Sequence, residues 1–160
     1  MPTWFAMSAQ ISVLAYAALG GVFLAFSDFI MRALALSGAP AGITVMQSIN
    51  REVFRWVFMA LFLGMVPVSL LLAGHGLLVQ GGAAGLIGLA GVVYLLGVFG
   101  VTAAGNVPLN EALAGMDAAS PEAQAMWQAR YLPRWTLLNS LRTGACFLAA
   151  ALALAGLLSA

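Results

Sequence analysis

Long apolar stretches alternate with short polar ones along this chain, and the apolar stretches are long enough to cross a lipid bilayer. About 20 apolar residues span the hydrocarbon core. Four stretches reach this length, at about residues 7–29, 43–73, 83–104 and 132–158. The second is longer than a span requires because its first turns are polar, and its apolar part begins near Trp56. The pattern therefore predicts four transmembrane helices.

Glycine and proline clusters predict where the first three helices end. The segment Ser37-Gly38-Ala39-Pro40-Ala41-Gly42 separates the first two apolar stretches. Gly74-His75-Gly76 and Gly81-Gly82 mark the loop between the second and third, so we interpret His75 as a loop residue. The third connection, residues 105–133, is the longest.

Two helix starts are predicted inside this third connection. Ser120-Pro121-Glu122 is typical of a helix start, with Ser120 as the N-cap and proline at the first helical position. A short helix from there to about Tyr131 follows. Asn106 is a second candidate N-cap, with Pro108 beginning another short helix toward Leu113.

The predicted fold is all-α. Long runs rich in leucine, alanine and methionine favour helices, whereas a membrane barrel would show short alternating strands. We expect a single domain over residues 1–160, a four-transmembrane-helix bundle with a short extra helix in the loop between helices 3 and 4. Glycine is dense in the third span, and small residues let membrane helices approach closely. That helix is therefore predicted to lie centrally in the bundle.

Composition narrows the class of protein. Of the 160 residues, 63% are apolar and 7% are charged, whereas an ordinary soluble domain is about 25% charged. This high apolar and low charged content excludes a soluble enzyme, a disordered chain and a nucleic-acid binder with a basic face. The single cysteine, Cys146, and the single histidine, His75, do not make a disulfide or a metal site by themselves. We therefore expect the lipid bilayer as a partner, no nucleic acid and no metal.

The arginines predict the orientation of the chain. All six lie in or beside the first and third loops, which four spans place on the same side: Arg32, Arg51, Arg55, Arg130, Arg134 and Arg142. The positive-inside rule then puts both termini outside the cytoplasm, in a bacterial inner membrane. Because the N-terminus lacks a basic region, we expect the first apolar run to be retained as a helix.

Polar residues gather where helices one and three end and where helices two and four begin. Alternating topology brings these four places to one face of the membrane. The set comprises Asp28, Arg32, Gln47, Asn50, Arg51, Arg55, Asn106, Asn110, Glu111, Arg134, Asn139 and Arg142. Helical spacing places Trp135, Asn139 and Arg142 on one stripe of the fourth helix. It likewise aligns Gln47, Arg51, Phe54 and Phe58 on the second.

Arg142 is the most informative of these residues. It lies about ten residues into the predicted fourth helix, or roughly 15 Å at 1.5 Å per residue, near mid-depth. A charge at that depth costs at least about 2.5–3.5 kcal/mol and faces the bundle interior with a partner. Asp28, at the matching end of the first helix, predicts an Asp28–Arg142 ion pair. We expect Asn50, Asn106 and Asn139 to flank it.

Four strings of residues carry a resemblance to a known family. They are Phe26-Ser27-Asp28-Phe29-Ile30-Met31, Met46-Gln47-Ser48-Ile49-Asn50, Asn106-Val107-Pro108-Leu109-Asn110 and the stretch from Trp135 to Thr143. In this order they resemble the anthrone-oxygenase-like family, small four-helix membrane proteins whose bacterial members are mostly of unknown function. The sequence departs from the family at Arg32, where a proline is expected after Met31.

The resemblance implies a chemistry. Characterised fungal relatives are similar to cofactor-free oxygenases that oxidise an anthrone to an anthraquinone. On that basis the catalytic candidates are Asp28 as the base and Arg142 with Asn139 as donors to an enolate oxygen. The candidates for binding a lipophilic small molecule are Gln47, Asn50, Phe54, Asn106, Asn110 and Trp135, with Phe58 as a further wall. No cofactor is implied.

Three functions stay open at this point. The first is a membrane enzyme or binder for a lipophilic aromatic or quinone-like molecule, which an apolar-walled pocket beside Asn139 and Arg142 would favour. The second is a small transporter or channel subunit that uses the Asp28 and Arg142 cluster. It would show a water-filled route, and four helices would need to form a homo-oligomer to enclose it. The third is a structural membrane partner, with a dry and fully paired polar cluster.

Overall fold

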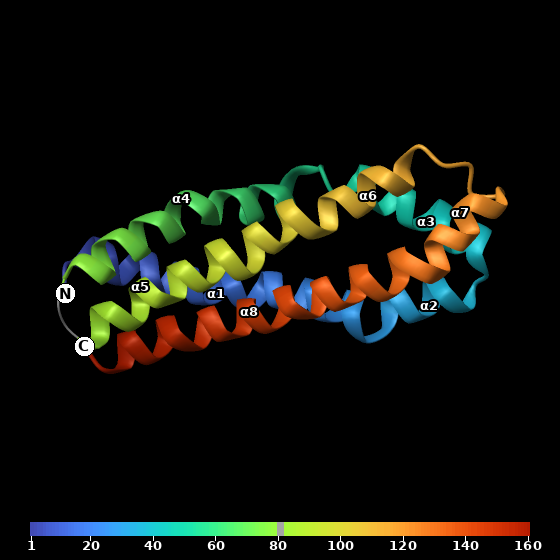
Figure 1. Cartoon of the computed structure of the whole chain (residues 1–160). Coiled ribbons are helices and arrows are strands. Elements are labelled where there is room, and N and C mark those ends of the chain that lie inside the picture. Colours follow the sequence, from blue (N-terminus) through green and yellow to red (C-terminus); the bar gives the residue numbers. More distant parts are fainter. Residues whose placement is uncertain (80–81) are drawn as a thin grey trace.

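Four long helices run antiparallel and form an elongated bundle (Figure 1). The structure is a computed structural model and describes residues 1–79 and 82–160. Its elements, in chain order, are α1 (Thr3–Ala25), η1 (Phe26–Ile30), α2 (Met31–Leu36), α3 (Ala39–Glu52), α4 (Trp56–Leu78), α5 (Gly82–Tyr94), η2 (Leu95–Gly100), η3 (Thr102–Asn106), α6 (Val107–Ala114), α7 (Pro121–Met126), η4 (Trp127–Tyr131) and α8 (Leu132–Leu158). The η segments are π-helical turns. The all-α prediction is confirmed.

Four continuous helices are long and apolar enough to cross a membrane: Thr3–Leu36, Trp56–Leu78, Gly82–Ala114 and Pro121–Leu158. They match the four predicted spans, so this is a multi-pass membrane protein. The helix that begins at Trp56 has 23 residues, about 35 Å, which is close to the thickness of a bilayer core. The other three have 33 to 38 residues, so they extend well beyond the hydrocarbon.

The second span differs most from its prediction. The stretch 43–73 is not one helix, because the chain breaks between Glu52 and Trp56. Arg55 adopts an extended conformation there, and its guanidinium pairs with Glu52 at 2.7 Å. The helix before the break, α3, buries one face through Gly42, Ile43 and Met46. It belongs to the part of the bundle beyond the hydrocarbon, where it need not continue the membrane-spanning helix.

The predicted second loop begins too early. Gly74, His75 and Gly76 lie inside α4, which continues to Leu78. Gly76 faces α5 so closely that an added Cβ would meet the backbone of Ala84 and, at 2.6 Å, the backbone N of Gly88. Gly76 therefore allows two helices to approach and does not form a turn. Gly82 opens α5, and the prediction for Gly81 falls outside the described residues.

The long third connection is mostly helical. Ser120 is the N-cap of α7, since its Oγ accepts a hydrogen bond from the backbone N–H of Ala123 at 3.1 Å. The helix that it starts does not stay separate, because it continues through η4 into α8. The predicted N-cap at Asn106 is wrong: the residue is helical, makes no side-chain cap bond and belongs to a helix that runs through Pro108. The first span was predicted to end near Phe29. In the structure the helix continues past Arg32 and ends at Leu36.

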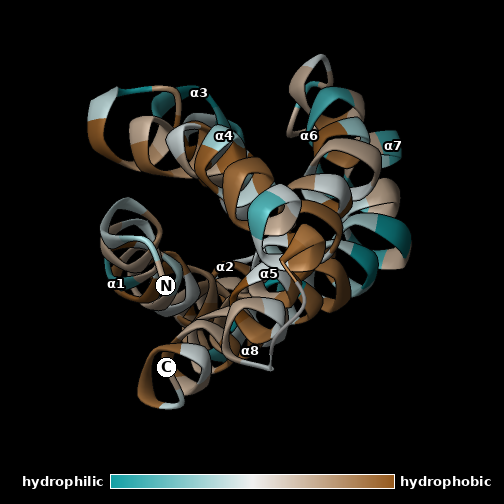
Figure 2. Cartoon of the chain, turned by 90° about the vertical axis from the view of Figure 1, so that its left-hand side faces the viewer, coloured by the Kyte–Doolittle hydropathy of each residue, from teal (hydrophilic) through white to brown (hydrophobic). Residues whose placement is uncertain are grey.

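The described residues form two large hydrophobic cores along the bundle, and a smaller cluster of Phe5, Ala9, Leu72 and Ile87 lies nearer the termini. The first joins α1, α4, α5 and α8, with Tyr16 stacked on Tyr94 at 4.9 Å between centroids. The second joins α2, α3, α6 and α7 around the aromatic rings of Trp127, Tyr131 and Trp135. Hydrophilic positions gather on α3, α6 and α7, which lie around the second core (Figure 2). The first core therefore corresponds to the membrane domain, and the second caps it.

Both termini lie at the end of the bundle opposite this cap (Figure 1). The six arginines lie on or beside the elements at the other end: α2, α3, η4, the first half of α8 and the break before α4. The predicted gathering of charge at one end is therefore present.

Candidate functional site

A cavity of about 940 Å³ lies where the two cores meet. All four long helices contribute to its walls. The lining is mostly apolar and includes the aromatic side chains of Phe23, Phe26, Phe54, Phe58, Phe62, Phe99 and Trp135. Its volume is at the upper end of the range of about 300–1,000 Å³ seen for small-molecule sites. The polar residues on its wall come from α3, η3, α6 and α8.

Three π-helical turns lie beside this cavity. Phe26 belongs to η1, Phe99 to η2, and Thr102 and Asn106 to η3, and all four side chains line the cavity. A π-helical turn holds one extra residue and so changes the direction of the side chains that follow it; such turns are frequent at functional sites. Here they decide which side chains face inward.

Arg142 is the central polar group of the site. Only 5% of its surface is exposed, although it carries a positive charge. Its guanidinium donates to Asn139 Oδ1 at 2.6 Å and to Thr102 Oγ1 at 3.2 Å. The guanidinium carbon also lies over the rings of Phe23 and Trp135, 4.3 and 5.3 Å from their centroids. Such cation–π contacts stabilise a desolvated cation.

Asn139 holds this guanidinium in place. The amide nitrogen donates to the backbone oxygen of Phe23 and to Ser27 Oγ, both at 2.6 Å. These two bonds turn the amide oxygen toward Arg142. Asn139 is fully buried, so the loss of these bonds would leave polar groups unpaired inside the bundle. The first helix is thereby connected to the fourth at the level of the cavity.

A second polar network converges on Asn110. Its Oδ1 accepts hydrogen bonds from Tyr131 at 2.8 Å and from Trp135 Nε1 at 2.9 Å. Asn50 donates to the Tyr131 hydroxyl at 3.3 Å. Asn106 donates to the backbone oxygen of Trp135 at 3.3 Å, and its own Oδ1 is buried without a partner among the described residues. The predicted grouping of these residues is present in the structure.

Gln47 and Phe54 also line the cavity, from its outer side. The amide nitrogen of Gln47 donates to the backbone oxygens of Leu113 and Met116, at 2.8 and 2.9 Å. It therefore caps the C-terminal end of α6. Phe54 lies in the break before α4 and is 72% exposed, so it belongs to the mouth of the cavity. Because of the break, the predicted stripe from Gln47 to Phe58 is not one continuous helical face.

The predicted ion pair between Asp28 and Arg142 is wrong. Asp28 is exposed, and its side chain is outside the lining of the cavity. In residues 1–79 and 82–160 the ion pair formed is Arg55–Glu52, with no carboxylate on Arg142. The cause is η1, which contains Asp28 and interrupts the 3.6-residue period that the prediction assumed. Phe23 and Ser27 meet Asn139 instead.

The predicted mid-depth position of Arg142 assumes a fourth helix that begins near Leu132, and its depth in a membrane stays a prediction. The fourth helix begins at Pro121 rather than near Leu132, so its start does not mark the interface. Measured from the other end, Arg142 is sixteen residues before Leu158, where α8 ends, or about 24 Å. If α8 ends at the far surface of a core about 30 Å thick, the guanidinium lies nearer the arginine-rich face than mid-depth.

Two carboxylates line the cavity, Glu52 and Glu111. Glu111 belongs to the polar set predicted at this face, but neither residue was predicted to be catalytic or to bind a ligand. Glu52 is paired with Arg55. Glu111 follows Asn110 on α6, is exposed, and has no ion-pair partner in the part of the chain that the structure describes. Thr102 and Phe23 were missed as well. The position at the end of the third span was the available signal for Glu111. Thr102 belongs to the π-helical turn η3, which has no clear sequence signal, and Phe23 lies on α1 one turn before Ser27.

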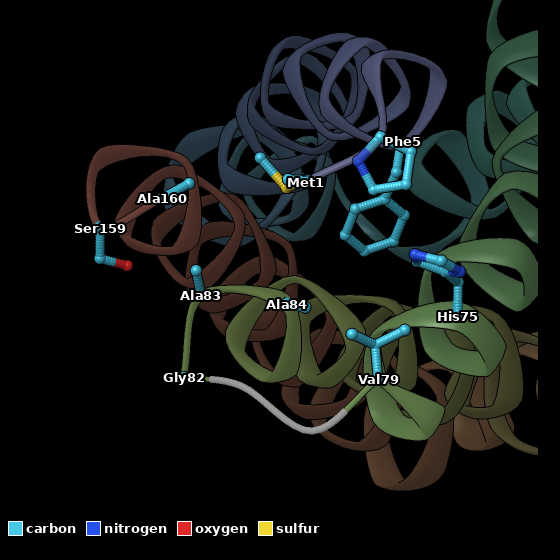
Figure 3. Close-up of a pocket in the computed structure, with 10 residues that line it drawn as sticks. Met1, Phe5, His75, Val79, Gly82, Ala83, Ala84, Ser159 and Ala160 are labelled. Atoms are coloured by element: carbon cyan, nitrogen blue, oxygen red, sulfur yellow. The ribbon is translucent and has the colours of Figure 1, made fainter.

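A smaller cavity of about 320 Å³ lies at the opposite end of the bundle, near both termini. Figure 3 shows His75 beside Phe5 on its wall, with ring centroids 4.6 Å apart. The Nε2 atom of His75 is buried without a hydrogen-bond partner among the described residues. No arginine or carboxylate side chain lines this cavity within the described ranges. The larger cavity is therefore the candidate site.

Replacing Asn110 with leucine is expected to lower the free energy of unfolding by about 1–2 kcal/mol, because two buried donors lose their shared acceptor. The comparison variant is Asn110→Asp, which retains an accepting oxygen for Tyr131 and Trp135. Thermal unfolding in detergent, followed by tryptophan fluorescence, measures the difference. Equal stability of the two variants would contradict the role of Asn110 as the shared acceptor.

Comparison with known families gives one match. The family model described as anthrone oxygenase matches residues 58–152. The matched region runs from α4 through most of α8 and includes Thr102, Asn106, Asn110, Asn139 and Arg142. No match was found among curated proteins or among solved structures.

Proposed function

The chain belongs to the anthrone oxygenase family, whose model covers more than half of its length, and from this membership we propose that the larger cavity binds and oxidises a lipophilic aromatic ketone of the anthrone type. The observation that carries the proposal is the buried guanidinium of Arg142, which faces an apolar cavity without a carboxylate partner in the described part of the chain. An enolate oxygen supplies the negative charge that this arrangement lacks.

The proposed reaction uses molecular oxygen as the oxidant. A base removes one proton from the methylene group of the anthrone, and the ring carbonyl becomes an enolate stabilised by Arg142. The resulting carbanion forms a carbon–oxygen bond with O₂ and takes up a proton, which gives a hydroperoxide. Loss of the second methylene proton with cleavage of the O–O bond releases water and leaves the second carbonyl. One O₂ is thus consumed for each anthraquinone and each water formed.

Glu111 is the proposed proton acceptor. A base must reach the substrate, and Asp28 is exposed outside the cavity lining. Of the two carboxylates that do line the cavity, Glu52 is engaged by Arg55 at 2.7 Å. Glu111 is not so engaged in the described residues, and its neighbour Asn110 belongs to the polar network.

We also propose that the arginine-rich end with its helical cap faces the cytoplasm, following the positive-inside rule. Both termini, at the opposite end of the bundle, then lie outside. This placement would put the mouth of the cavity, near Phe54, at the cytoplasmic surface.

The test is oxidation of anthrone by the purified protein in detergent, with O₂ uptake and anthraquinone absorbance recorded together. We expect equal amounts of O₂ consumed and quinone formed. Glu111→Gln should lower kcat by about 10²-fold or more, as expected for loss of a general base, and should change KM little. The control is Glu122→Gln, an exposed residue of α7 outside the cavity. No oxidation above the protein-free rate would refute the proposed activity, and an unchanged kcat in Glu111→Gln would refute the assigned base.

A further inference from the structure

The cavity has a polar side and an apolar side. Arg142, Asn139, Asn106 and Asn110 approach it from α8, η3 and α6. The end of α1 and the beginning of α4 present apolar side chains to the same cavity: Val22, Phe58, Met59, Phe62 and Leu63, together with Phe23, whose ring the Arg142 guanidinium covers. A ligand that fits both sides must be amphiphilic, with a polar group at one end and hydrocarbon at the other.

The apolar side coincides with the seam between α1 and α4, which we define here by Val22 and Phe23 on α1 and Phe58 and Leu63 on α4. Val22 and Leu63 both line the cavity and are 43% and 47% exposed, so neither is covered by the neighbouring helix. The seam therefore connects the cavity with the surroundings of the bundle. Other neighbouring helix pairs, such as α1 with α8 and α4 with α5, pack together much more extensively.

Depth along the helices places this seam in hydrocarbon. Leu63 is seven residues into the membrane span that begins at Trp56, about 10 Å below its start. Val22 is nineteen residues from the start of α1 at Thr3, about 28 Å from the other end of the bundle. On these lengths Leu63 falls inside a core about 30 Å thick and Val22 near its edge on the arginine-rich side, so the seam borders the outer part of the hydrocarbon.

The seam is closed by different contacts at different depths. Deeper in the membrane domain, Tyr16 of α1 and Ser69 of α4 share a buried hydrogen bond of 2.7 Å. At the level of the cavity, Phe23 contacts Phe58 edge to face, with ring centroids 5.9 Å apart. Aromatic rings can change rotamer without leaving a polar group unpaired, whereas breaking the Tyr16–Ser69 bond would leave two. The seam can therefore open at the cavity while it stays closed below.

We infer that the ligand is a bilayer-dissolved aromatic molecule with an apolar tail, and that it reaches the cavity from the hydrocarbon between α1 and α4, where the tail remains. This inference rests on the proposed function, because it assigns the aromatic head to the side of Arg142. The large volume agrees with it: about 940 Å³ is more than a small ring system alone requires.

The test compares two quinones with the same ring system, menadione without a long tail and phylloquinone with a phytyl tail. Each is equilibrated between protein-containing and empty lipid nanodiscs, and the bound amount is measured by absorbance after extraction. The seam is blocked in Val22→Trp and Leu63→Trp. Matched controls are Leu14→Trp and Leu70→Trp, exposed positions on the same two helices outside the cavity.

We expect the seam variants to weaken phylloquinone binding at least tenfold and menadione binding less than twofold, and the controls to change neither. Equal effects on both quinones, or none, would overturn the inference about the tail. The proposed head site is tested separately by Arg142→Ala, which should weaken both quinones alike. If wild-type protein binds neither quinone, the proposed function and this inference both fail; if it binds both and the seam variants do not discriminate, the inference alone fails.

Discussion

Replacing Arg142 with alanine is expected to lower kcat/KM for anthrone oxidation by about 10²–10³-fold. Loss of a single preorganised donor to a developing oxyanion typically has an effect of this size. In this protein the guanidinium is 5% exposed, so water does not replace it efficiently. The charge is also held in position by Asn139 and Thr102 before a substrate arrives. A loss much smaller than this would mean that Arg142 does not contact the reacting oxygen.

Matched variants distinguish whether the loss of rate in Arg142→Ala comes from the missing charge, from the missing geometry or from a less stable protein. Arg134→Ala removes an exposed arginine from the same helix and should leave kcat/KM within a factor of about two. Arg142→Lys keeps the charge but loses the planar fork that bonds Asn139 and Thr102 together, and should recover only part of the rate. Size-exclusion chromatography and thermal unfolding show whether Arg142→Ala is still folded. A folded Arg142→Ala protein with wild-type kcat/KM would contradict the proposed site.

The number of helices and the end of the bundle that holds the site could be predicted from the sequence. Both follow from long-range regularities: apolar runs of sufficient length, and arginines confined to two of the connections. Neither depends on knowing which side chain faces which. The anthrone oxygenase resemblance, carried by strings around Asn106 and Asn139, is likewise confirmed by the family match.

The direction in which each side chain points could not be predicted, because it depends on the number of residues in every preceding helical turn. A prediction that counts in steps of 3.6 residues fails after a π-helical turn, and η1 lies at Asp28. Ser27 lies in this π-helical turn and, with the backbone oxygen of Phe23 one turn earlier, contacts Asn139 in place of Asp28. Residues on α8, where no π-helical turn separates Trp135 from Arg142, were placed correctly on one stripe.

Glycine was ambiguous for a different reason. A glycine pair around His75 is compatible with a turn and with close helix packing, and local sequence does not distinguish them. The structure uses Gly76 for packing against α5, so α4 is longer than predicted. In the third span, by contrast, the glycines recur along one apolar helix, and their predicted packing role is present in the structure at Gly88 and Gly91.

Replacing Gly91 with alanine is expected to lower the free energy of unfolding by about 2–3 kcal/mol, a typical cost of overpacking a tight core. An added Cβ would collide with the backbone oxygen of Ser69 and lie 3.0 Å from the backbone N of Ala73. Both obstacles are backbone atoms of α4, so no rotamer change relieves them and the helices must separate. Separation also disturbs Ser69, whose hydroxyl bonds Tyr16 on the opposite helix.

Gly85→Ala is the matched control, since it lies on the same helix and an added Cβ there meets nothing within 4 Å. Alanine favours a helix over glycine by about 0.5–1 kcal/mol, so this variant should equal or exceed wild-type stability. Fluorescence-detected size-exclusion after heating in detergent compares the two. Gly91→Ala at wild-type stability would show that α4 and α5 separate at little cost, and that the close backbone contact is not what holds this side of the bundle. If the contact does hold it, α4 is held more tightly against α5 than against α1, where the cavity opens.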